Sequence, residues 1–159
     1  KALDAAVEAL HSADMIVLAP GSLYTSIIPN LLVDGIADAI RDSKALKLYV
    51  CNVMTQEGET EGYTVSDHIQ ALFSHSYPRL FPLCLTNSMP IPACIARRYA
   101  QEGAEPIYHD TEKCRALGVE LIERPIASLE NGLVRHNPGH LAHELMTIYE
   151  EYTSQKDPT

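Results

Sequence analysis

The sequence predicts an α/β fold in which a mostly parallel β-sheet is covered by helices. Short, continuous apolar runs such as residues 15–19 (MIVLA) are typical of strands buried on both faces. These runs alternate with segments whose apolar residues recur at helical spacing. Because parallel neighbours must be joined by a crossover, usually a helix, this alternation favours a parallel sheet.

Apolar segments separated by turns or polar loops are predicted as strands. They span residues 15–19, 46–51, 80–86, 106–109 and 119–123. Proline lacks the N–H group that a central strand needs, so Pro82 indicates the beginning of its strand or an edge strand. The carboxyl ends of parallel strands meet at one edge of the sheet, where the ligands of such sheets bind.

Helical periodicity predicts the remaining regular segments. The opening helix has apolar residues on one face: Leu3, Ala6, Val7 and Leu10. Later helices are expected over residues 26–41 (interrupted at Pro29 and Gly35), after Thr64, and over residues 92–102, 111–117 and 138–152. Thr64 and Asp67 have the spacing of a capping box, and Gly103 suits a helix end. Residues 153–159 are expected to form a polar tail.

Composition describes an acidic globular chain. Its 159 residues are 46% hydrophobic, which can fill a core, and 12 basic against 21 acidic residues give a net charge of −9. The acidic balance argues against a nucleic-acid partner, because phosphates would be repelled at long range. No stretch approaches the roughly 18 apolar residues of a membrane span, so none is expected.

The cysteines and the first residue concern the compartment and the extent of the chain. The four cysteines form no C-x-x-C pair, which excludes a zinc ribbon or thioredoxin motif: Cys51, Cys84, Cys94 and Cys114. Scattered cysteines with apolar neighbours favour a reduced, cytoplasmic protein. Lys1 opens directly into a helical pattern without an initiator Met, so we expect a piece of a longer chain.

The loop after the first strand is a candidate ligand site. It leaves a buried strand and enters a helix, so its backbone N–H groups and the helix dipole would face outward together. Gly21 permits close approach, and hydroxyl groups suit a phosphate or a sugar; the candidate residues are Gly21, Ser22, Leu23, Tyr24, Thr25 and Ser26. The alternative is that Thr25 or Ser26 only caps the helix.

The loop after the second strand would lie on the same rim. Its neutral hydrogen-bonding side chains, Asn52, Thr55 and Gln56, suit a base, sugar or amide edge. The loop is longer than a minimal connection requires, which favours function over the alternative of a solvated surface loop.

Two further candidates lie in the second half. Arg135, in what we predict to be a polar turn, could clamp a diphosphate or pair with Glu130 or Glu144. Tyr99 could stack on a base or pack on the core.

The histidines and the Asp67–His68 pair suggest no catalytic or metal site. Adjacent helical residues point about 100° apart, so Asp67 and His68 form no charge relay, and Asp67 is better explained as a helix N-terminal carboxylate. His136, His140 and His143 have helical spacing without a clustered carboxylate or cysteine, and surface histidines are the favoured interpretation. No catalytic residue and no metal ligand is predicted.

Three longer motifs resemble the YvcK family of bacterial gluconeogenesis factors, within the CofD-like superfamily. They are residues 20–33 (PGSLYTSIIPNLLV), residues 51–63 with Ser66-Asp67-His68, and residues 99–106 together with Arg135-His136-Asn137. The similarity covers essentially the whole chain. Glu57 departs from the family pattern, where we expect proline.

The resemblance implies more than the residues alone. Members are roughly twice this length, so residues 1–152 would be the C-terminal part of a single Rossmann-like, three-layer CofD-like α/β domain with helices on both faces. It implies a regulator that binds UDP-sugars such as UDP-N-acetylglucosamine and acts in cell shape, wall synthesis and growth on gluconeogenic carbon sources. By motif position, Tyr99 and Arg135 match the residues implicated in UDP-sugar contact.

Other functions stay open beside the regulator, which would need no cofactor. One is a transferase using a nucleotide-diphosphate donor and magnesium, as in the CofD enzymes that make a phospholactyl deazaflavin. Another is a dinucleotide-binding Rossmann relative, which predicts a thermal shift with NAD. Cell-wall regulatory proteins and a second copy of the chain are the macromolecular partners that we consider.

Overall fold

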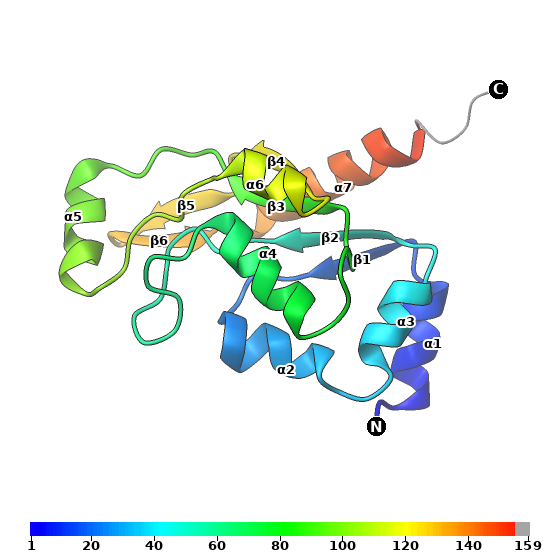
Figure 1. The fold of residues 1–159 in the computed structure, drawn as a ribbon. Helices are drawn as coiled ribbons and strands as arrows, with labels where there is room; N and C mark the ends of the chain where they lie inside the picture. Colours follow the sequence, from blue (N-terminus) through cyan, green and yellow to red (C-terminus); the bar gives the residue numbers. More distant parts are fainter. Residues whose placement is uncertain (155–159) are drawn as a thin grey trace.

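The sheet is parallel and its strands follow one another in chain order. The computed structural model describes residues 1–154 (Figure 1). Four strands pair in the order β1-β2-β3-β4: β1 Met15–Leu18, β2 Leu46–Val50, β3 Leu83–Asn87 and β4 Glu120–Arg124. The pairing is parallel throughout, with Leu18 opposite Tyr49 and Val50 opposite Leu85. The carboxyl ends of all four strands therefore meet at one edge.

Helices connect the strands, and an antiparallel hairpin follows them. The helices are α1 Asp4–Ser12, the π-helix η1 Leu23–Ile27, α2 Ile28–Leu31, α3 Ile36–Asp42, α4 Val65–Ser74, α5 Ala93–Gln101, α6 Thr111–Ala116 and α7 Pro138–Ser154. The hairpin consists of β5 Ala127–Glu130 and β6 Leu133–His136.

Each sheet face has its own core. On β2, Leu48 and Val50 pack on one face, whereas Tyr49 packs on the other, as strand alternation requires. Right-handed crossovers between strands in sequential order place the connecting helices on one face. α7 covers the opposite face, where Ile148 is fully buried (Figure 1). The predicted three-layer arrangement is thus confirmed.

Most predicted elements are confirmed within one to three residues. The predicted helix over residues 26–41 begins earlier, with η1, and Gly35 interrupts it in the left-handed conformation (φ 97°). Pro29 lies in the first turn of α2 and causes no break, because that position needs no N–H donor. Pro82 directly precedes β3, as expected.

Residues 106–109 are not a strand, which corrects one prediction. Only Pro106 forms a bridge, with Met54. The segment hydrogen-bonds to two separate elements: Ile107 N–H donates to the Val53 carbonyl, and the Tyr108 carbonyl accepts from Val65 N–H at the start of α4. It therefore joins the loop after β2 to α4.

The β5–β6 hairpin was missed, and the prediction of a polar turn at Arg135 is wrong. Asn131 and Gly132 connect the strands with positive φ angles of 51° and 74°, as a type I′ turn requires. The Asn-Gly pair is the sequence signal that could have identified it. α7 also continues to Ser154, past the predicted boundary at residue 152, and residues 155–159 of the expected tail lie outside the described residues.

Asp110 joins two helices at their N-termini. Its carboxylate accepts hydrogen bonds from the Ser66 backbone N–H (2.9 Å), the Ser66 hydroxyl and the Thr64 hydroxyl (2.7 Å). Thr64 and Asp67 form the predicted capping box of α4. Partial burial would raise the pKa of the Asp110 carboxyl, but the hydrogen bonds from Ser66 and Thr64 outweigh it, and the pKa lies below its ordinary value.

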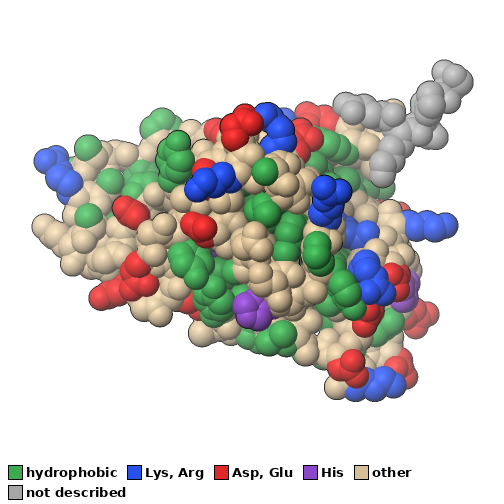
Figure 2. Space-filling view, in the orientation of Figure 1, with side chains coloured by type: hydrophobic (Ala, Val, Ile, Leu, Met, Phe, Trp, Pro, Cys, Tyr) green, Lys and Arg blue, Asp and Glu red, His purple; other side chains and the backbone are tan. Residues whose placement is uncertain are grey.

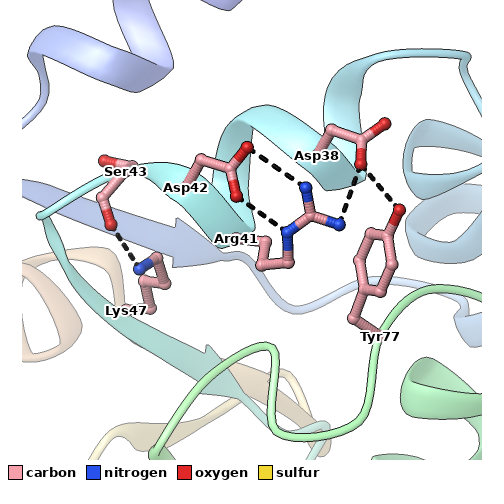
Figure 3. A network of polar contacts seen from close by, with 6 residues as sticks. All are labelled: Asp38, Arg41, Asp42, Ser43, Lys47 and Tyr77. Atoms are coloured by element: carbon pink, nitrogen blue, oxygen red, sulfur yellow. Dashed lines mark hydrogen bonds and ion pairs between the residues drawn. The ribbon is translucent and has the colours of Figure 1, made fainter.

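A surface network joins α3 to the chain that follows α4 (Figure 3). Arg41 pairs with Asp38 (3.0 Å) and Asp42 (2.7 Å), and its guanidinium lies 4.3 Å from the centre of the Tyr77 ring. The Tyr77 hydroxyl donates to Asp38 (2.6 Å). Exposed ion pairs contribute little stability, so we expect this network to add little to the stability of the fold.

No single helix among residues 1–154 is long and apolar enough to cross a bilayer. The segments Leu23–Leu31 and Ile36–Asp42 reach that length only together, and they are bent by 72° at their junction.

Removing the buried face of α7 should destabilise the fold. Ile148→Ala is expected to lower the free energy of unfolding by about 2–5 kcal/mol, because a cavity would be left against the sheet. Urea denaturation measures the change. Met146→Ala is the matched control, since Met146 lies on the same helix with 54% of its surface exposed. Equal effects of the two substitutions would contradict the packing of α7 on the sheet.

The Asp110 carboxylate should stabilise the fold in a pH-dependent way. Its pKa is depressed in the folded state, so its contribution is present above the unfolded pKa of about 3.9 and is lost as pH falls through the folded value. Asp110→Asn should therefore lower the urea midpoint at pH 7, and the difference from the parent should shrink below about pH 4. Asp34→Asn, at an exposed position, is the control. A pH-independent difference would contradict the assignment.

Candidate ligand-binding site

A cavity of about 290 Å³ lies at the carboxyl ends of β1 and β2. The segments that follow these two strands form one side, and α5 and the hairpin, which lie beyond the strand ends in Figure 1, form the other. Its lining residues are Gly21, Ser22, Asn52, Val53, Met54, Thr55, Gln56, Tyr99, Val134, Arg135 and His136.

The cavity brings together most of the predicted site residues, although they come from four separate segments. These are Gly21, Ser22, Asn52, Thr55, Gln56, Tyr99 and Arg135. Four others lie outside it. Leu23 is fully buried in the core, and the Tyr24 hydroxyl hydrogen-bonds the Tyr63 hydroxyl (2.8 Å). Thr25 is exposed beside Glu59, and Ser26 lines a different, apolar cavity beside β1.

The backbone N–H groups expected to receive an anion already hold one from within the chain. The Glu59 carboxylate accepts from the N–H groups of Leu23, Tyr24 and Thr25, each at 3.1 Å. A carboxylate is favourable at the N-terminus of a helix because of the unpaired N–H groups there. Glu59 therefore fixes the loop after β2 against the start of η1.

Two predicted polar residues also hold the loops in place. The Asn52 side chain donates to the Gly21 carbonyl (2.8 Å) and accepts from the Gly21 N–H (3.1 Å). The buried Thr55 accepts from the Glu105 N–H through its hydroxyl (2.9 Å). These groups shape the cavity, so they are less available to a ligand than the sequence suggested.

Arg135 is available for an anion. Among the described residues its guanidinium has no hydrogen-bond or ion-pair partner, and the side chain is exposed. The two carboxylates considered as partners are engaged elsewhere. Glu144 pairs with Arg124 (3.3 Å), and Glu130 accepts from the Ser128 hydroxyl (3.1 Å).

Tyr99 holds the hairpin against α5. Its hydroxyl oxygen accepts from the Val134 N–H (2.9 Å), and neighbouring Arg98 donates to the Gly132 carbonyl. Val134 lies opposite Leu129, one position away from the two-residue turn. Residues at this position of an antiparallel pair do not hydrogen-bond to each other, so the Val134 N–H points away from the partner strand. The Tyr99 hydroxyl oxygen accepts a hydrogen bond from this N–H, so the hydroxyl proton can still be donated to another acceptor.

His136 is a cavity residue that the sequence reasoning assigned to the surface. It is half-buried, and its Nε2 lies 3.3 Å from the Cys51 carbonyl at the end of β2. Burial lowers the pKa of His136, and the hydrogen bond with the Cys51 carbonyl opposes this effect without cancelling it. The sequence analysis did not predict the hairpin, and it is the hairpin that brings His136 back over β2.

Asp67 and His68 make separate contacts at the start of α4, which supports the interpretation that they form no charge relay. Asp67 caps α4, and buried His68 uses Nδ1 to bond the Thr64 carbonyl (2.8 Å). Within residues 1–154, no group of three or more His, Cys, Asp or Glu side chains is arranged to hold a metal ion.

The sequence profile of the family described as 2-phospho-L-lactate transferase CofD matches residues 1–127. This chain therefore belongs to the CofD family. The match ends at the first residue of β5, so the hairpin that carries Arg135 and His136 lies beyond it.

Individual relatives are named gluconeogenesis factors. The chain is 44% identical to the gluconeogenesis factor of Halalkalibacterium halodurans, over 92% of this chain and 45% of that protein. It is 41% identical to that of Bacillus subtilis, over 91% of this chain and 46% of the relative. The chain thus spans a little under half the length of these relatives.

A crystal structure of a UPF0052 family member from Bacillus halodurans has the same fold. Its TM-score is 0.88 at 44% identity, with 92% of this chain and 47% of that chain covered.

Replacing Glu59 should loosen the start of η1. The two carboxylate oxygens of Glu59 accept from three backbone N–H groups, and Glu59→Gln removes their negative charge. Hydrogen bonds to a charged acceptor are stronger than those to a neutral one. Amide hydrogen exchange at residues 23–25 is expected to accelerate about tenfold or more. Glu57→Gln, at an exposed position in the same loop, should leave it unchanged. Unaltered exchange in Glu59→Gln would contradict this role.

Proposed function

We propose that this chain forms part of the binding site of a regulatory protein that recognises a UDP-sugar such as UDP-N-acetylglucosamine. In this proposal the protein acts in the cytoplasm and couples nucleotide-sugar supply to cell shape, wall synthesis and growth on gluconeogenic carbon sources. The observation that carries it is the convergence of an unpaired Arg135 with Tyr99 in one cavity at the carboxyl edge of the sheet.

The chemistry of the cavity supports a nucleotide sugar. Arg135 offers a planar cation for a diphosphate, Tyr99 offers a ring and a hydroxyl proton, and Ser22 and Gln56 add neutral hydrogen-bonding groups. Figure 2 shows acidic and basic side chains interspersed on the face in view, so one local arginine matters more than a broad basic field.

The size of the cavity supports binding of part of such a ligand. Its volume of about 290 Å³ lies just below the usual range of ligand pockets, about 300–1,000 Å³. The chain spans under half of its relatives, so we propose that groups outside these 159 residues complete the site.

A transferase that uses a nucleotide-diphosphate donor and magnesium is the second candidate. The match to the CofD profile over residues 1–127 favours it. Product formation that depends on magnesium and a guanosine diphosphate donor would support it against the regulator, whereas uridine-ligand binding without turnover would support the regulator.

Arg135→Ala should lower the affinity for UDP-N-acetylglucosamine by about 10- to 150-fold, as expected for loss of a charge-assisted contact of roughly 1.5–3 kcal/mol. Isothermal titration calorimetry on the full natural polypeptide that contains this sequence measures the change. Arg97→Ala is the control, because Arg97 is exposed on α5 and does not line the cavity. Equal affinity of the folded Arg135→Ala variant and the parent would remove Arg135 from the site.

A further inference from the structure

His136 carries an inference that rests on the proposed function. We infer that His136 is the specificity residue that recognises uracil, by accepting the N3–H hydrogen of the base at its Nδ1 atom. The charge of the cavity does not point to this residue, because its position over β2 depends on the hairpin.

The tautomer of His136 follows from its protein partner. A carbonyl oxygen can only accept, so Nε2 must carry the proton that it donates to the Cys51 carbonyl. A neutral imidazole has one donor and one acceptor nitrogen, and Nδ1 is therefore the acceptor. The contact with Cys51 holds the ring in a single tautomer.

The Nδ1 atom is open to the cavity. Among the described residues, the buried side-chain N and O atoms without a hydrogen-bond partner are Tyr49 Oη and His68 Nε2. Nδ1 of His136 also has no protein partner, but it is not one of these buried atoms. Solvent therefore reaches Nδ1. His136 lines the cavity, which makes this acceptor available to a ligand.

Arg135 and His136 line the same cavity from consecutive positions of β6. Alternate residues of a strand share a face, so His136 and Val134 lie on one side of the ribbon and Arg135 on the other. Tyr99, bonded to the Val134 N–H, supplies a hydroxyl donor to the same cavity that His136 lines. The base would lie near Tyr99 and His136, and the diphosphate would lie at the rim near Arg135.

This donor and acceptor pattern matches uracil and disfavours cytosine. The imide edge of uracil presents N3–H between two carbonyl oxygens, so it needs a protein acceptor flanked by donors. Cytosine presents a bare N3 acceptor at the same place, and two acceptors would face each other. A buried polar group left unpaired in this way is costly, which is how such sites discriminate strongly.

The test combines a protein change with a ligand change on the full natural polypeptide. His136→Gln keeps an amide N–H that can reach the Cys51 carbonyl and removes the ring nitrogen at the Nδ1 position. Affinities are measured by calorimetry for UDP, CDP and N3-methyl-UDP. The parent should prefer UDP over both by about 10-fold or more, and His136→Gln should bind UDP about 5- to 100-fold more weakly, with little preference left.

The outcomes are distinguishable from those of the proposed function. If the parent binds no UDP or UDP-N-acetylglucosamine, the proposed function fails. If the parent binds them but tolerates N3-methylation, or if His136→Gln keeps the full preference for UDP, the role of His136 is overturned and the function stands. Urea unfolding of His136→Gln, compared with His136→Ala, checks that the contact with Cys51 is retained. Should His136→Gln not fold, tolerance of N3-methylation by the parent would still overturn the role of His136.

Discussion

The parallel order of the four strands is the constraint on which the rest of this structure depends. Strands that run the same way end at the same edge, and every crossover between them must return across the sheet. With right-handed crossovers in sequential order, the connecting helices occupy one face, and α7 is needed to cover the other. The same geometry brings the segments after β1 and β2 side by side and so creates the floor of the cavity.

Much of the polar chemistry at this edge is used to hold the loops rather than to face a ligand. Glu59 satisfies the N–H groups at the start of η1, and Asn52 pairs with both backbone groups of Gly21. Unpaired backbone groups would be costly near the core, so the chain supplies its own partners. The proposed recognition rests on groups that these contacts leave available, chiefly Arg135, the Tyr99 proton and Nδ1 of His136.

The hairpin begins where the similarity to the CofD profile ends. The CofD profile covers the four-stranded sheet and its connecting helices, up to residue 127, whereas the hairpin and α7 follow it. The similarity to the relatives named gluconeogenesis factors includes the hairpin, because it extends over more than nine-tenths of this chain.

The sequence by itself determined the α/β class, the four sheet strands and nearly all the helices, because apolar periodicity and capping residues act locally. Thr64 with Asp67 is an example, since both partners of the capping box lie within one turn. It also identified the loops after β1 and β2, because they follow recognisable buried strands. What it missed were features with distant partners, such as the segment at Pro106 and the placement of the hairpin.

Only the tertiary structure decided which polar groups remain free. Glu59 lies 34 or more residues from the N–H groups that it binds, and His136 lies 85 residues from the Cys51 carbonyl. No local pattern encodes such pairings, because they depend on how the strands and the hairpin pack. The sequence therefore determined where a site could form, and the tertiary contacts decided which side chains can act in it.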